Sequence, residues 1–94
     1  MDIKQIIKDA RDPNSKDNTF RLFWDQYQRT AAHIRDRNIL CFPMKTLEAN
    51  VQLLAAKLKN LRMENEAEKR EVIAQEIVDL IETSQATMEQ LLKL

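Results

Sequence analysis

No glycine occurs among the 94 residues of this chain. Glycine adopts positive φ without a steric penalty, and tight β-hairpin turns, phosphate-binding loops and nucleophile elbows depend on it. We therefore expect an all-α fold, a small helical bundle whose helices are joined by short turns.

The C-terminal half, residues 44–94, has neither glycine nor proline, and its apolar residues follow helical spacing. From Leu47 to Leu61 they step by four, three, four and three, the alternation of a helix that packs one seam against a partner. The two series are Leu47, Val51, Leu54, Leu58 and Leu61, then Ile73, Ile77, Leu80, Ser84, Thr87, Leu91 and Leu94. They predict helices at 44–62 and 66–93.

A short charged segment separates the two series. In a single helix, at about 100° per residue, Ile73 would lie about 120° around the axis from Leu61. Either the chain reverses near residues 63–66 and forms an αα-hairpin, or one helix about 70–75 Å long serves partners on two sides. Asn65 followed by Glu68 resembles a capping box, so we favour the hairpin.

The first residues predict a short helix at 2–11, with Asp2 as its cap and isoleucines on one face. Asp12-Pro13-Asn14-Ser15 is a strong turn signal. Another helix is predicted at 18–41. Residues 1–13 thus form a short N-terminal helix and turn, and residues 18–94 the bundle, within a single helical domain.

The helix at 18–41 carries an aromatic stripe, because Phe20, Trp24 and Tyr27 recur at steps of four and three. Such a stripe usually belongs to a core; the alternative is an exposed ledge that stacks a base or contacts a partner. We expect these residues to pack together: Phe20, Trp24, Tyr27, Ile34, Leu47, Val51, Leu54, Leu58, Leu61, Ile77, Leu80 and Leu91.

Charged residues follow the same helix at intervals of four. They are Arg21, Asp25, Arg29, His33 and Arg37, with Arg35 to one side. The simple interpretation is a solvated surface with one or two ion pairs. The functional one is a row of guanidinium groups that clamps phosphates or a carboxylate-rich surface.

Charge is also divided along the chain. Residues 14–62 hold nine basic and four acidic residues, whereas residues 63–94 hold three basic and eight acidic residues. Either helices of opposite sign lie side by side and screen each other, or a basic face stays open to an anion or an acidic partner.

An apolar corner, Ile39 to Met44, precedes the C-terminal half. Pro43 restricts the residue before it and suits the first turn of a new helix. Such a corner either caps the core or contacts another subunit. Since a chain this short buries a limited share of its surface, we expect a homo-oligomer, most simply a dimer.

Residues suited to catalysis are few. His33 and Cys41 are the single histidine and cysteine, eight positions apart, which is no zinc spacing and leaves no histidine for a second role. We therefore expect no enzyme, no catalytic residue, no metal and no cofactor. One cysteine fits a reducing compartment, and no apolar run approaches the about 20 residues that span a bilayer, so we expect a cytoplasmic protein without a membrane.

These observations favour a non-enzymatic helical interaction protein, an adaptor, regulator or inhibitor that acts through the Arg-rich helix face and the apolar corner. The alternative is an oligomeric binder of an anionic ligand, either a nucleotide, a small phosphorylated molecule or nucleic acid, with Phe23 or Tyr27 stacking on it. In both cases the expected contacts are Arg21, Arg29, His33, Arg35, Arg37, Phe42, Met44 and Lys45.

Overall fold

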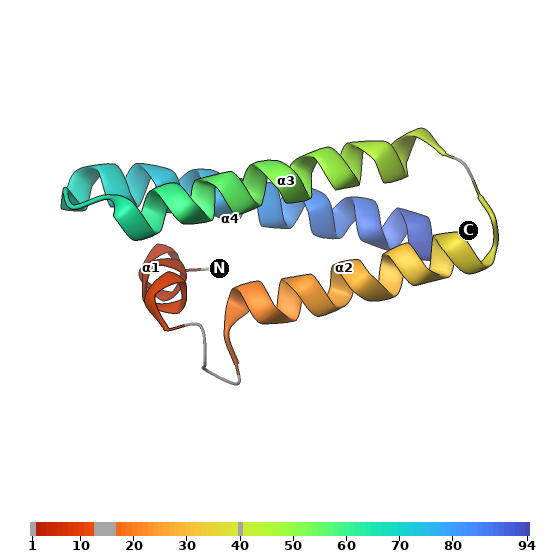
Figure 1. Ribbon diagram of the computed structural model, residues 1–94, viewed down its shortest axis with the longest axis horizontal. Coiled ribbons are helices and arrows are strands. Elements are labelled where there is room, and N and C mark those ends of the chain that lie inside the picture. Colours follow the sequence, from red (N-terminus) through yellow and green to blue (C-terminus); the bar gives the residue numbers. More distant parts are fainter. Residues whose placement is uncertain (1, 13–16, 40) are drawn as a thin grey trace.

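The computed structural model describes residues 2–12, 17–39 and 41–94, and these form four helices and no strand (Figure 1). The all-α bundle predicted from the sequence is confirmed. The turn predicted at residues 12–15 lies mostly outside the described part of the chain. The helices are α1 (Ile3–Arg11), α2 (Thr19–Asp36), α3 (Phe42–Met63) and α4 (Ala67–Leu92).

Helices α3 and α4 form the predicted hairpin (Figure 1). Leu47, Leu54 and Leu61 of α3 are buried, as are Ile77 and Leu91 of α4. On the flank of this interface the ammonium group of Lys57 forms an ion pair with Glu76. The alternative of one long helix is therefore wrong.

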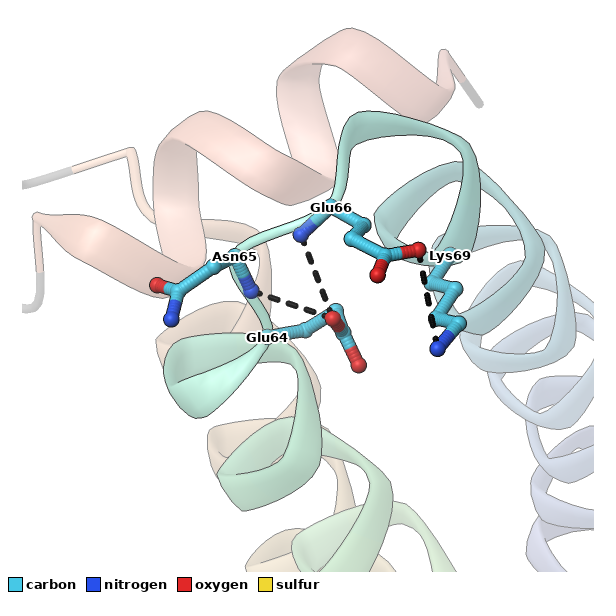
Figure 2. Close-up of polar contacts among 4 residues, drawn as sticks. All are labelled: Glu64, Asn65, Glu66 and Lys69. Atoms are coloured by element: carbon cyan, nitrogen blue, oxygen red, sulfur yellow. Dashed lines mark hydrogen bonds and ion pairs between the residues drawn. The ribbon is translucent and has the colours of Figure 1, made fainter.

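The hairpin turn is made without glycine because its residues stay extended: Glu64 has φ −79° and ψ 130°, and Glu66 has φ −85° and ψ 127°. A carboxylate oxygen of Glu64 accepts hydrogen bonds from the backbone N–H groups of Asn65 (3.1 Å) and Glu66 (3.2 Å) (Figure 2). The guanidinium of Arg70 donates to the Glu64 carbonyl at 2.7 Å. The turn is thus tied to the first turn of α4.

The predicted capping box at Asn65 is wrong. The N-cap of α4 is Glu66, one residue later, and its side chain makes no cap hydrogen bond. Instead the Glu66 carboxylate lies 3.5 Å from the Lys69 ammonium (Figure 2). The reason is local: the acceptor that serves the N–H groups of the turn is the carboxylate of Glu64, and the side chain of Asn65 is not needed for it.

Helix α2 ends at Asp36, five residues before the predicted end at 41, because Asn38 takes the left-handed conformation, with φ 54°. The N–H of Asn38 bonds to the carbonyl of Arg35 (3.0 Å) and that of Ile39 to the carbonyl of Ile34 (3.2 Å). This is a Schellman motif with asparagine in the place that glycine usually takes. Asparagine tolerates that conformation better than other non-glycine residues.

A reciprocal clasp joins the end of α1 to the start of α2. The Asn18 side chain caps α2 by accepting from the N–H of Phe20 (2.9 Å), and it donates to the carbonyls of Asp9 (2.8 Å) and Asp12 (2.7 Å). The Asp9 carboxylate in turn accepts the N–H of Thr19 at 2.8 Å. Both side chains are buried, so the clasp fixes the direction in which α1 crosses the bundle.

Helix α4 is the centre of the structure, since α1, α2 and α3 all pack on it, whereas α2 and α3 scarcely touch. In Figure 1, α2 and α3 lie on either side of α4, and α1 is seen nearly end-on beside the start of α2, below the closed end of the hairpin. The guanidinium of Arg62 donates to the Ala10 carbonyl at 2.9 Å and so ties α3 to α1.

Most of the residues predicted to pack do so. Ile34, Leu47, Leu54, Leu61, Ile77 and Leu91 are buried, and Phe20, Tyr27, Val51, Leu58 and Leu80 are half-buried against the core. The exception is Trp24, whose side chain is 49% exposed. Its placement in the core was wrong, and the reason lies in how α2 packs on α4.

The clasp predicts a specific loss of stability. Replacing Asn18 with Ala removes its hydrogen bonds to the N–H groups of Phe20 and Arg21 and to the carbonyls of Asp9 and Asp12. Because the buried Asp9 carbonyl loses this donor, we expect the free energy of unfolding to fall by about 1–3 kcal/mol. Urea denaturation followed by circular dichroism measures it, with Asn60→Ala, at an exposed position of α3, as the control. Equal stability of Asn18→Ala and wild type would show that the clasp contributes nothing.

The carboxyl group of Asp9 predicts that the stability of the protein depends on pH in the acid range. Burial alone raises the pKa of its carboxyl group, but hydrogen bonds from Thr19 and Gln5 and the charge of Lys8 outweigh burial, so the pKa lies below its ordinary value of 3.8. Its contribution to stability is therefore complete above pH 3.8 and is lost as the pH falls through the lower pKa of the folded state.

We expect Asp9→Asn to be less stable than wild type at neutral pH and to lose less stability on acidification from about pH 5 to about pH 3. Asp25→Asn, at an exposed position of α2, should keep the wild-type slope. Stability is measured by urea denaturation at each pH. Equal losses of stability in Asp9→Asn and wild type would show that Asp9 is not the source of the pH dependence.

Candidate functional site

An apolar groove of about 110 Å³ lies between α2 and α3. Its floor contains Phe23 and Leu54, which are also part of the core, and its walls carry Trp24 and Ala55, which are exposed. The side chains that line it are all apolar: Phe20, Phe23 and Trp24 from α2, and Val51, Leu54, Ala55 and Leu58 from α3.

The groove exists because both helices have apolar arcs wider than α4 can cover. In α2, Phe23 and Ile34 are buried, whereas Trp24 lies about 100° around the axis from Phe23. In α3, Leu54 is buried and Ala55 again lies about 100° away. In a bundle of four full-length helices each helix has two neighbours. Here the apolar edges of α2 and α3 face each other with no helix between them.

Helix α1 lies beside one end of this groove. It contacts α2, α3 and α4, and the bond from Arg62 to the Ala10 carbonyl holds it beside the end of α3. It crosses the other helices instead of running along them (Figure 1), and none of its described residues lines the groove. The lining runs from Phe20 and Leu58, at the α1 end, to Trp24 and Val51.

Trp24 and Tyr27 form an aromatic pair at the open side of the groove. Their ring centroids are 5.4 Å apart with an interplanar angle of 33°. Burial, and then the negative charge of Glu48 on α3, raises the pKa of the Tyr27 phenol above its ordinary value. Tyr27 therefore faces α3, and Trp24 presents its exposed part to solvent.

The structure separates the charged residues that recur every four positions along α2. Each step of four turns about 40° around the helix, so the series from Arg21 to Arg37 winds through about 160°. Arg21 lies on the turn of α2 that lines the groove, Arg35 lies near the other end of α2, and Arg29 lines a different hollow between α2 and α4. The guanidinium of Arg37 donates to the carbonyl of His33 at 3.4 Å. These side chains do not form one clamp.

The hollow beside Arg29 has both polar and apolar lining residues and a volume of about 390 Å³. The side chains of Gln26 and Gln85 are joined across it by a hydrogen bond of 3.0 Å. Glu89 also lines it and offsets the charge of Arg29. A site for an anion would need an excess of positive charge here, which the lining residues do not provide.

The two residues expected to stack on a base differ in access. Phe23 is only 3% exposed, so the prediction that it stacks on a ligand is wrong, because α2 turns Phe23 toward α4. Tyr27 is half-buried and packs on Trp24. The stacking surface that the structure does offer is Trp24, which the spacing had assigned to the core.

The apolar corner is divided by the start of α3. Phe42 is 80% exposed, Met44 is half-buried against the core, and Lys45 is exposed. Cys41 is half-buried and unpaired with another cysteine. Leu40 lies outside the described residues. The corner thus both covers the core and presents one aromatic ring to solvent.

Among the residues that the structure describes, no three His, Cys, Asp or Glu side chains are grouped so that they could hold a metal ion. None of the described helices combines the length and the apolar character that crossing a bilayer requires. Comparison with protein-family models, with curated proteins and with solved structures gives no match.

The two adjacent aromatic residues of α2 should differ in their effect on stability. We expect Phe23→Ala to lower the free energy of unfolding by about 3–5 kcal/mol, since it empties a buried site. Trp24→Ala should cost only about 1–2 kcal/mol, because half of its side chain is already in water. Urea denaturation followed by circular dichroism measures both. A larger loss for Trp24→Ala would mean that Trp24 is a core residue.

Proposed function

We propose that this protein is a non-enzymatic binding module that takes an apolar segment of a partner protein into the groove between α2 and α3. The observation that carries this proposal is the groove itself, an apolar concavity between two helices whose facing edges lack a neighbour. Trp24 at its edge, 49% exposed beside Tyr27, is an aromatic anchor of the kind that dominates binding energy at interfaces.

A helix is the segment that fits this groove best. Two helices flank an open slot over α4, so a helix laid into it would complete a four-helix arrangement and cover both apolar edges. Helix-in-groove recognition works through apolar residues at i, i+3, i+4 and i+7 of the bound segment. The exposed ring of Phe42 at the corner adds a second apolar contact beyond the groove.

The anionic-ligand alternative has less support. It rests on the basic excess of residues 14–62, but the arginines of α2 point in different directions and Phe23 is buried. A homo-oligomer stays a prediction from the small size of the chain. Cytoplasmic placement belongs to the same proposal, since the single cysteine, Cys41, cannot form an intrachain disulfide.

Two exposed alanines of α3 give a matched test. Ala55 lines the groove, whereas Ala49 lies about 120° around the same helix. We expect a photocrosslinking residue at Ala55 to capture one partner polypeptide, identified by mass spectrometry, and the same residue at Ala49 to capture none.

The purified partner should then change the fluorescence of Trp24, the single tryptophan, on titration. This change should disappear in Ala55→Glu and persist in Ala49→Glu, with the circular dichroism of both variants unchanged. Equal capture from both alanines, or binding that Ala55→Glu leaves intact, would place the interface elsewhere. Capture of a second copy of this chain would identify the groove as a dimer contact.

A further inference from the structure

We propose that the partner segment is an acidic amphipathic helix: apolar on the side that enters the groove and rich in Asp and Glu on its flanks. This inference rests on the proposed function, because it specifies the chemistry of the segment that the α2–α3 groove binds. It is carried by the charges that border the groove, which are separate from its apolar lining.

On α2 the border is basic. Arg35 lies about 20° and Arg21 about 60° beyond Trp24 around the helix, on the side away from α4. Gln28, between them, is uncharged. Both arginines are exposed, and the only carboxylate near Arg35 among the described residues is Asp36, at 3.9 Å on the surface. An exposed pair of this kind contributes little and leaves the guanidinium available.

On α3 the border is also basic on balance. Lys59 lies about 40° and Lys45 about 80° beyond Ala55. Both are exposed, and in the described part of the chain neither has a carboxylate within 4.0 Å. Glu48 is the acidic member of this border, and its charge acts on the phenol of Tyr27.

Two cations flank one end of the groove. Phe20 and Leu58 line its α1 end together, which places Arg21 and Lys59 there. Arg35 and Lys45 lie beyond the other end of the lining, toward the α2–α3 corner, since the two helices run in opposite directions (Figure 1). A bound helix would therefore meet a positive charge from each wall at the α1 end, and a helix that continued toward the corner would approach Arg35 and Lys45.

The acidic residues of α4 do not neutralise this border. Lys57, on the side of α3 that faces α4, pairs with Glu76, and Lys69 pairs with Glu66 at the hairpin turn. A carboxylate of α4 thus screens a lysine of α3 on the side of α3 that faces α4, as expected for neighbouring helices of opposite charge. The groove side keeps its positive potential, which favours an acidic partner and repels a basic one.

A second copy of this chain is a poor occupant. Two grooves placed face to face would bring like charges together. The acidic helix of a second copy, α4, has its apolar stripe buried in its own core. Its large exposed apolar residues are Val72 and Leu92, at opposite ends of the helix. It therefore cannot offer the apolar side that the groove requires.

The groove also limits the length of its partner. The groove is lined on α2 from Phe20 to Trp24 and on α3 from Val51 to Leu58, so its longer wall spans about 12 Å. This length accommodates about two helical turns. The bound segment thus needs two or three apolar anchors, with acidic residues beside them.

Three synthetic peptides test this inference. They share one set of apolar residues at i, i+3, i+4 and i+7, contain no tryptophan, and carry Glu, Gln or Lys at all flanking positions. We expect the Glu peptide to bind at least tenfold tighter than the Lys peptide, by Trp24 fluorescence and by calorimetry. The difference should shrink as salt rises, because exposed charges are screened.

Two double variants with the same net charge test whether the preference for the Glu peptide depends on the basic border of the groove. Arg21→Glu with Lys59→Glu should remove or reverse the preference for the Glu peptide. Arg29→Glu with Lys93→Glu, at exposed positions away from the groove, should keep it. Ala55→Glu should abolish binding of every peptide. Circular dichroism confirms that each variant is folded.

The outcomes separate the two proposals. Equal binding of all three peptides, or tighter binding of the Lys peptide, with loss in Ala55→Glu, would overturn the acidic partner and leave the groove as a binding site. No binding by any peptide would overturn both. A dimer seen by light scattering and abolished by Ala55→Glu would assign the groove to a second copy and also overturn the acidic partner.

Discussion

The packing of three helices on α4 is the interaction on which the rest of the structure depends. The buried residues of α4 cover an arc of about 140°, and two of them, Ala74 and Ser84, are small enough to let neighbouring helices approach closely. This arc accepts α3 on one side and α2 on the other. It cannot also bring α2 and α3 together, so their facing apolar edges remain partly exposed. The groove is therefore a consequence of how one helix organises its neighbours.

The connections between helices show how a chain without glycine makes its turns. Asn38 takes the left-handed position at the end of α2, and the hairpin turn keeps Glu64 and Glu66 extended while a carboxylate serves the N–H groups. At the third connection, Asp9 and Asn18 exchange hydrogen bonds across buried surface. This clasp matters for the groove, because it fixes the direction of α1 beside the end that Phe20 and Leu58 line.

The uneven distribution of charge along the chain becomes a difference between surfaces. The basic excess belongs to α2 and α3, which flank the groove, and the acidic excess belongs to the turn and α4. Since α4 packs against both flanking helices, its carboxylates reach them on the side away from the groove, as Glu76 reaches Lys57. An apolar groove with a basic border combines the two terms that govern helix recognition, apolar burial for affinity and charge for the choice of partner.

Helical periodicity is a local property, so the amino-acid pattern predicted the helices, the hairpin and much of the core, with Leu47, Leu54 and Leu61 on one seam. The pattern did not predict which part of a wide apolar arc is covered. Phe20, Phe23 and Trp24 all satisfy the spacing of a packed helix, yet Phe23 is buried and Trp24 is half in water. That outcome depends on the number and direction of the neighbouring helices, which are set by long-range packing and cannot be read from local spacing.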